Sequence, residues 1–298
     1  MIKVFNQSEL NKLYKPASNS TGEDNGQVTI IGGSELFHGA PILALKVASR
    51  IVDMVFFSSP EKSIGHIAET MKSKLMSFIW VPWEEIENYI EKSDAVLIGP
   101  GFKRYKSELR IKNHELRSNA LGEDGELSRK ITERLLKQFP KKKWVIDAGS
   151  LQTMEADWIP KGSILTPNRK EFEMLFGSEI RNTRYEIRGE QDRIASLVLR
   201  IAKKHKCVIV LKGSVTMVAL PEDVVIVKGG NAGMTKGGTG DVLAGLTVGL
   251  LAKNEPFLAA TSASYIAKAA GDELYKKVGV NYNADDLANQ IPEILGNF

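Results

Sequence analysis

The sequence predicts an α/β protein of three layers, in which helices cover both faces of a mostly parallel central sheet. Strand-like and helix-like segments alternate along the chain, which is the order expected when helices connect parallel strands. Most of the strand-like segments are continuous apolar runs, as expected for strands buried on both faces. Glycines, carboxylates and lysines gather where these runs end, and open α/β sheets bind ligands beyond the carboxyl ends of their strands.

The first half of the chain starts with a polar stretch, residues 1–26, which we expect to be an N-terminal extension. The apolar run that follows ends at a pair of glycines. Apolar residues at helical spacing then begin at Pro41, whose missing N–H costs nothing in a first helical turn. In chain order, we expect strand 27–31, helix 41–51, strand 53–58, strand 77–81, helix 83–90 and a strand over 94–101 that ends in a glycine turn. Residues 102–125 are polar and indicate a surface insertion.

The second half repeats the alternation and ends in helices. Its expected elements are helix 128–139, strand 143–149 with a carboxylate at its C-terminal end, strand 163–168, helix 169–176 ending at Gly177, loop 178–190, helix 192–205, strand 207–213, a hairpin of 216–220 with 224–227, and helices 241–252, 257–277 and 284–296. No linker rich in Pro, Gly or Ser divides the chain, so we expect residues 1–298 to form a single domain.

Composition narrows the class of protein. The 40 basic and 36 acidic residues leave a net charge of +4, which is too balanced to argue for nucleic acid as a partner. The single cysteine, Cys207, lies in an apolar run and excludes an intrachain disulfide framework. The N-terminus does not resemble a signal peptide, and no apolar run reaches membrane-spanning length. We therefore expect a cytoplasmic protein without a membrane or nucleic-acid partner.

The most informative stretch is the glycine-rich loop within residues 229–245, which runs into an apolar helix. The first N–H groups of a helix lack internal partners, and glycines let a phosphate approach them. Asp241 is expected in the first turn, facing whatever this anion hole holds. The alternative is a tight glycine turn in which Asp241 is only a helix cap. The density of glycines favours a phosphate-binding loop with a carboxylate at its mouth.

Taken together, the motifs resemble those of the ADP/ATP-dependent NAD(P)H-hydrate dehydratase family, a branch of the ribokinase-like fold. The resemblance runs from about residue 26 to the C-terminus, without the epimerase domain of bifunctional members. The motifs that carry it are Gly32-Gly33-Ser34, Gly39-Ala40-Pro41, Gly99-Pro100-Gly101, Asp147-Ala148, Thr166-Pro167-Asn168 with Glu171, Leu211-Lys212-Gly213 with Thr216, and Asn231, Gly233 and Met234 before Gly237 to Gly245.

The resemblance implies that a nucleotide phosphorylates the hydroxyl of the hydrated nicotinamide ring, after which phosphate leaves and the double bond returns. It implies Asp241 as the base that accepts the hydroxyl proton, and Gly238 and Gly240 in the loop that cradles the transferred group. The residues implied for ADP or ATP are Lys212, Gly213, Ser214, Val215, Thr216, Asn231 and Gly240. Those implied for NAD(P)H-hydrate are Ala40, Gly101, Asn168 and Asp241. Glu171 is implied, through water, near Mg²⁺. A homo-oligomer is also implied.

The chain departs from the family pattern at three places. Asn168 replaces a usual histidine, Gly149 replaces a common second aspartate, and Thr235-Lys236 precede GGTGD where small residues are usual. Lys236 is either a further cation for a phosphate or a solvated loop lysine. Two other functions stay open: a vitamin-precursor kinase of the same fold, and a non-catalytic nucleotide-binding protein. The sequence does not distinguish ADP from ATP, or NADH-hydrate from NADPH-hydrate.

Overall fold

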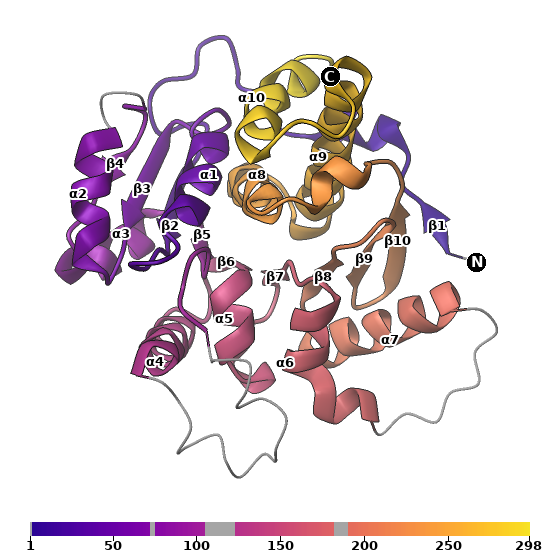
Figure 1. The fold of residues 1–298 in the computed structure, drawn as a ribbon, viewed down its shortest axis with the longest axis horizontal. Helices are drawn as coiled ribbons and strands as arrows, with labels where there is room; N and C mark the ends of the chain where they lie inside the picture. The colour runs from indigo at the N-terminus through magenta and orange to yellow at the C-terminus, as the bar shows by residue number, and fades with distance from the viewer. Residues whose placement is uncertain (1, 72–74, 105–122, 182–189) are drawn as a thin grey trace.

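The computed structural model describes residues 2–71, 75–104, 123–181 and 190–298, and these form three layers around one sheet (Figure 1). The strands are β1 Lys3–Val4, β2 Gln27–Ile31, β3 Met54–Ser58, β4 Ile79–Trp80, β5 Ala95–Ile98, β6 Lys143–Ile146, β7 Ile164–Leu165, β8 Val208–Leu211, β9 Thr216–Leu220 and β10 Asp223–Val227. Their order across the sheet is β1-β10-β9-β8-β7-β6-β5-β2-β3-β4.

The seven neighbouring strands β4, β3, β2, β5, β6, β7 and β8 all run parallel to one another. Strand β9 is antiparallel to both of its neighbours, β8 and β10. The predicted hairpin is therefore confirmed as β9–β10. The central strands alternate between two hydrophobic cores: Val28 and Ile30 face one, and Ile31 faces the other. This two-sided burial is the reason that the strands appear as unbroken apolar runs in the sequence.

Helices cover each face of the sheet. The helices of the first face are α1 Gly39–Ala48, α2 Lys62–Met71, α8 Thr239–Lys253, α9 Pro256–Val278 and α10 Ala284–Leu295. Those of the second face are α3 Ile86–Lys92, α4 Glu123–Gln138, α5 Ala148–Thr153, α6 Arg169–Arg181 and α7 Glu190–His205. Within the described residues, no helix is both long and apolar enough to cross a bilayer.

Several boundaries differ from those predicted. Helix α6 continues past Gly177 to Arg181, because packing of Phe176 in the core, an ion pair of Glu179 with Lys204 and a hydrogen bond of Glu179 with His205 offset a glycine cost of roughly 1 kcal/mol. Helix α4 begins at Glu123 rather than 128. Of the predicted insertion and loop, residues 105–122 and 182–189 lie outside the described residues.

Several elements were not predicted. Helix α2 buries Ile64 and Ala68, one turn apart, and the polar residues between them concealed this spacing. Helix α5 follows β6 at once. The N-terminal stretch adds β1 to the sheet edge, and its short 3₁₀ helix η1 Gln7–Lys12 buries Leu10 completely. Part of residues 1–26 therefore packs with the sheet instead of extending from it.

Candidate active site

A cavity of about 470 Å³ lies at the carboxyl ends of the strands, where the sequence predicts ligand binding. The segments that follow five strands, β2, β5, β6, β7 and β8, contribute to it, and the glycine-rich loop before α8 completes it. Its lining residues are Phe37, Ala40, Gly101, Phe102, Arg104, Asp147, Ala148, Gly149, Gln152, Asn168, Glu171, Lys212 and residues 234–241.

Most of the predicted site residues meet in this cavity. Those that line it are Ala40, Gly101, Asn168, Glu171, Lys212, Gly238, Gly240 and Asp241. They come from positions as far apart in sequence as Ala40 and Asp241, so only the folded sheet brings them together. The predicted nucleotide residues Gly213, Ser214, Val215, Thr216 and Asn231 are not among the lining residues.

Helix α8 starts from the glycine-rich loop. Its N-cap is Gly238, in the left-handed region at φ 93°, a conformation that glycine adopts without strain. Asp241 lies in the first turn, beside N–H groups that have no partner within the helix. The Thr239 hydroxyl donates to the carbonyl oxygens of Met234 and Lys236, and this closes the loop onto the helix start. The loop thus presents backbone donors and one carboxylate to the cavity.

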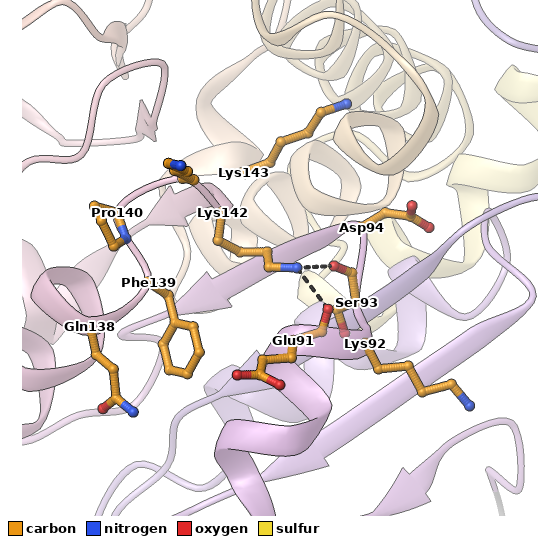
Figure 2. A pocket seen from close by; sticks show the side chains of 10 residues that line it. Glu91, Lys92, Ser93, Asp94, Gln138, Phe139, Pro140, Lys142 and Lys143 are labelled. Atoms are coloured by element: carbon orange, nitrogen blue, oxygen red, sulfur yellow. Dashed lines mark hydrogen bonds between the residues drawn. The ribbon is translucent and has the colours of Figure 1, made fainter.

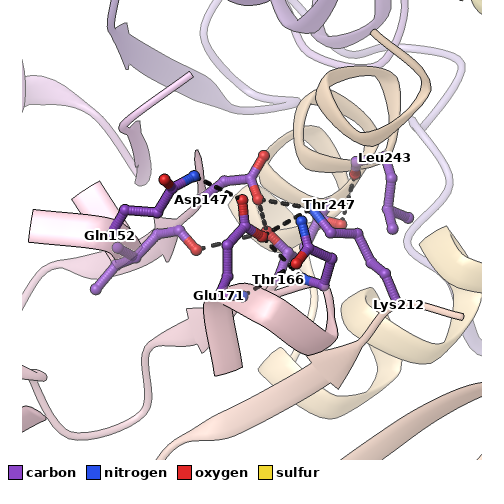
Figure 3. A network of polar contacts seen from close by, with 9 residues as sticks. Asp147, Gln152, Thr166, Glu171, Lys212, Leu243 and Thr247 are labelled. Atoms are coloured by element: carbon purple, nitrogen blue, oxygen red, sulfur yellow. Dashed lines mark hydrogen bonds and ion pairs between the residues drawn. The ribbon is translucent and has the colours of Figure 1, made fainter. Parts of the chain in front are cut away.

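A cluster of charged side chains that lines the cavity forms a network of polar contacts (Figure 3). Lys212 Nζ donates to Asp147 Oδ1 at 2.9 Å and lies 3.9 Å from Glu171 Oε2. The Thr166 hydroxyl also donates to Asp147 Oδ1, at 2.8 Å. Asp147 is the N-cap residue of α5, yet its side chain makes no capping bond and turns to Lys212 instead. Lys212 is therefore shared by the carboxylates of Asp147, which follows β6, and Glu171, in the first turn of α6, and the charge of Asp241, in the first turn of α8, also acts on it.

Burial and the neighbouring carboxylates change the pKa values of the side chains in this cluster. Burial, and then the nearby Asp147 carboxylate, raises the pKa of Asp241 to about 7, although Lys212 opposes the shift. Burial likewise raises the pKa of Glu171. For Lys212, burial alone would lower the pKa, but the surrounding carboxylates outweigh it and raise the pKa overall. A carboxylate whose pKa lies near neutrality is suited to exchange a proton with a substrate at physiological pH.

Asn168, which replaces the family's histidine, forms the start of helix α6. Its side-chain oxygen accepts from the Glu171 N–H at 3.0 Å, and its own N–H donates to Glu171 Oε2 at 2.8 Å. This reciprocal pair is a capping box, which satisfies two otherwise unpaired donors at the helix start. Asparagine is among the best N-cap residues, so its presence here has a local structural reason.

The second departure, Gly149, also has a structural reason. A Cβ atom at this position would lie 2.4 Å from the carbonyl oxygen of Phe102 and 2.6 Å from its Cβ. Any other side chain would therefore force the Gly149 and Phe102 backbones apart. Phe102 is buried at the cavity wall, so the absence of an aspartate here follows from close packing of two strand-end segments.

Lys236 is exposed in the loop, in line with the expectation of a solvated loop lysine, but it also has partners that were not expected. Its ammonium donates to the carbonyl oxygens of Val280 and Tyr282, in the connection between α9 and α10. Lys236 therefore ties the glycine-rich loop to the C-terminal helices. Asn231 also ties this loop to the C-terminal segments. Its side chain accepts from Gly233 N and Tyr282 Oη and donates to Gly271 O.

The carboxylates of the cavity are the side chains available to Mg²⁺. Among the described residues, no group of three or more His, Cys, Asp or Glu side chains could hold a metal ion. Both Glu171 oxygens accept hydrogen bonds, one from Gln152 Nε2 and one from Asn168 N. Mg²⁺ usually keeps several waters and binds through one or two carboxylates and substrate phosphates. Asp147 fits that kind of site, and Glu171 fits contact through water.

Some cavity residues were not assigned to the site from the sequence. Asp147 was noted only as a strand-end carboxylate, and Phe37, Arg104 and Gln152 were not noted. The Arg104 guanidinium stacks over the Phe37 ring, 5.6 Å from its centre. Asp147 could have been found, because it is a carboxylate at the end of an apolar strand, two strands away from the one that leads to Lys212. No sequence pattern marks the other three.

The sequence of this chain is similar to those of known proteins. The family model described as NAD(P)H-hydrate dehydratase matches residues 28–293. The bifunctional NAD(P)H-hydrate repair enzyme Nnr of Methanocaldococcus jannaschii is 34% identical over 99% of this chain and 53% of its own length. The ADP-dependent (S)-NAD(P)H-hydrate dehydratase of Nitrosopumilus maritimus is 29% identical over 100% of this chain and 96% of its own. The chain spans about half the length of the bifunctional relatives that it matches.

Solved structures agree on the fold. A ribokinase-like superfamily protein from Enterococcus faecalis matches with a TM-score of 0.75 at 20% identity, over 99% of this chain and 96% of that chain. The ADP/ATP-dependent NAD(P)H-hydrate dehydratase of Bacillus subtilis, co-crystallised with ATP and Mg²⁺, matches with a TM-score of 0.71 at 20% identity, over 99% and 98%. The fold is therefore ribokinase-like, as the sequence motifs imply.

Proposed function

Because the chain belongs to the NAD(P)H-hydrate dehydratase family, we propose that it uses ADP or ATP to convert (6S)-NAD(P)H-hydrate back to NAD(P)H. Hydroxide is a poor leaving group from the hydrated ring, whereas phosphate is a good one. The nucleotide's terminal phosphoryl group is transferred to the ring hydroxyl. Phosphate then leaves with the electrons of its C–O bond, and the neighbouring ring carbon releases a proton to solvent as the double bond forms. The reaction repairs a damaged cofactor and leaves no stable phosphoester.

The observation that carries this proposal is the position of Asp241. It stands in the first turn of α8, behind a glycine loop and within a cavity, and burial raises its pKa to about 7. A base with such a pKa removes a hydroxyl proton at neutral pH while it stays partly ionised. Phosphoryl transfer depends mostly on positioning and on stabilising negative charge.

We assign the remaining parts of the site by their geometry. Gly238 and Gly240 hold the transferred phosphoryl group with backbone N–H donors. Lys212 offers positive charge from the β8 side, and a Cβ at residue 240 would lie 3.3 Å from its Nζ. Ala40, Gly101 and Asn168 line the opposite side, where we place NAD(P)H-hydrate. Mg²⁺, when bound, neutralises charge on the phosphates.

The test is an incubation of the purified chain with hydrated NADH, Mg²⁺ and either ADP or ATP. Recovery of reduced-nicotinamide absorbance, with phosphate released in equal amount, is the expected result. A matched incubation without nucleotide should show no recovery above the spontaneous rate. Accumulation of a stable phosphorylated alcohol would instead identify a small-molecule kinase. Nucleotide binding without turnover would identify a non-catalytic protein.

The wider proposal keeps three expectations from the sequence: one domain over residues 1–298, action in the cytoplasm, and assembly into a homo-oligomer. The continuous ten-stranded sheet supports the first of these. Light scattering of the purified chain tests the third.

A further inference from the structure

A buried lysine outside the cavity, Lys268, makes contacts that the proposed reaction does not use. It lies midway along α9 and is 6% exposed. Its Nζ donates to the carbonyl oxygens of Gly229 at 2.8 Å, Ser214 at 2.9 Å and Gly213 at 3.3 Å. An ammonium group has three donors, and here each has a backbone acceptor.

The three carbonyl groups belong to two turns that are distant in sequence. Gly213 and Ser214 lie between β8 and β9, directly after the cavity residue Lys212. Gly229 follows β10 and starts the chain segment that leads into the glycine-rich loop. Turn carbonyls of this kind have no partner in the sheet ladder, so a buried cation that binds all three fixes the distance between the turns.

Asp272, one helical turn after Lys268, holds the second turn from the same helix. Its carboxylate accepts from Gly230 N at 2.9 Å and from Asn231 Nδ2 at 3.3 Å. Lys268 thus binds carbonyl oxygens and Asp272 binds N–H groups of adjoining residues. Together these two side chains fix the turn through both its carbonyl group at Gly229 and its N–H group at Gly230.

The two turns border the phosphate-binding end of the cavity. Lys212 precedes one of them and lies close to Gly240. The other leads to Met234, a cavity residue whose sulfur would lie 2.9 Å from a Cβ at Gly230. Gly213 and Ser214 are exposed, so their outer surface is open to a ligand while Lys268 supports their inner surface.

We propose that Lys268 is a positioning residue for the nucleotide: it holds the turns at Gly213–Ser214 and Gly229–Gly230 at the separation that an adenine nucleotide requires. This inference rests on the proposed function and adds to it a residue that touches neither substrate. It also accounts for the predicted nucleotide residues that lie just outside the cavity, since Lys268 binds the carbonyls of two of them.

The test compares ADP binding, measured by calorimetry with Mg²⁺, in the wild-type chain and in Lys268→Met. Methionine keeps the apolar stem and removes the ammonium. The dissociation constant of ADP should rise about tenfold, the change expected when hydrogen bonds to a charged group are lost. In the dehydratase assay, the KM for nucleotide should rise by a similar factor, while the KM for hydrated NADH should stay within about twofold.

Lys142→Met is the matched control. Lys142 also has a pKa lowered by burial and also binds two backbone carbonyls, but at the opposite end of the sheet (Figure 2). It should leave ADP binding unchanged. An equal loss in both variants would mean that general destabilisation, not positioning, weakens binding, and would overturn the inference.

An unchanged ADP affinity in folded Lys268→Met also overturns it, without affecting the proposed function. Absence of ADP binding to the wild-type chain would overturn the proposed function and this inference with it. If Lys268→Met does not fold, Lys268→Arg tests the same point. The planar guanidinium keeps the charge but cannot place one small cation among three carbonyls, so at least a threefold loss of ADP affinity is expected. Wild-type affinity in that variant would contradict the proposal.

Discussion

The two ends of the parallel sheet both carry a cavity and lysines, yet they use them differently. At the amino ends of β5 and β6, a cavity of about 770 Å³ is lined by Glu91–Asp94 and Gln138–Lys143 (Figure 2). There, Lys142 donates to Glu91 O and Ser93 O, at the end of α3, and Lys143 donates to Leu251 O, near the end of α8. At the carboxyl ends, Lys212 meets carboxylates instead (Figure 3).

The difference follows from helix polarity. Connecting helices end near the amino ends of the strands, where their free carbonyl groups attract cations. They begin near the carboxyl ends, where free N–H groups attract anions. Helix α8 shows both effects. Asp241 lies in its first turn, and Lys143 of β6 donates to the carbonyl oxygens of Leu251 and Asn254 at its end. In the larger cavity, Lys142 and Lys143 therefore bind backbone carbonyls, while the smaller cavity keeps donors and a titrating carboxylate for a ligand.

The largest expected effect is a loss of activity at the carboxyl ends of the strands, when Asp241 is replaced. Asp241→Asn should lower kcat by about 10³-fold, because general bases contribute roughly 10²–10⁴-fold. ADP binding should persist. The variant should also unfold at a higher temperature at neutral pH, since it removes a carboxylate whose ionised form the fold disfavours. Turnover within tenfold of wild type would remove Asp241 as the base.

A smaller effect is expected from pH alone. A carboxylate with a raised pKa is protonated as pH falls through that value, and a protonated Asp241 cannot accept a proton. We therefore expect kcat/KM to decline about tenfold per pH unit below about 7, and so about 100-fold by pH 5. The check is a pH–rate profile with circular dichroism at each pH. A flat profile between pH 5 and 8 in folded protein would contradict the assignment.

The third prediction compares two glycines of the loop, Gly240 and Gly237, as positions that a phosphate could approach. A Cβ at residue 240 would stand 3.3 Å from Lys212 Nζ, whereas a Cβ at Gly237 would meet no atom within 4 Å. Gly240→Ala should therefore raise the KM for nucleotide about tenfold by obstructing the anion site, and Gly237→Ala should raise it much less. Steady-state kinetics with varied ADP measures both. Equal effects would show that the space beside Lys212 does not matter.

The smallest effect belongs to the amino end. Lys142→Met removes two hydrogen bonds to the end of α3 and should cost about 1 kcal/mol of stability, measured by urea unfolding. Its kcat and KM values should equal those of wild type. Lys141→Met, next to it and exposed, should change neither stability nor activity. A loss of activity in Lys142→Met would mean that the amino-end cavity takes part in function.

The positions of Asp241 and Lys212 were predictable because each depends on local order. A glycine loop before an apolar run predicts a helix start with Asp241 in its first turn, and Lys212 ends an apolar run that predicts a strand. The extension of α6 past Gly177 was not predictable from propensity, since partners from α7 decide it. Neither was the burial of Leu10 within a polar stretch.

The sequence by itself determined the α/β class, the parallel sheet, the glycine-rich loop and the family, because periodicity and ordered motifs are written along the chain. Only the tertiary structure decided what the individual side chains do. It brought Asp147, Glu171 and Asp241 around one lysine, explained Asn168 as a helix cap, and placed Lys268 behind two turns. Charge and packing act through space, so a pKa, a shared cation or a supported turn depends on neighbours that the chain order does not reveal.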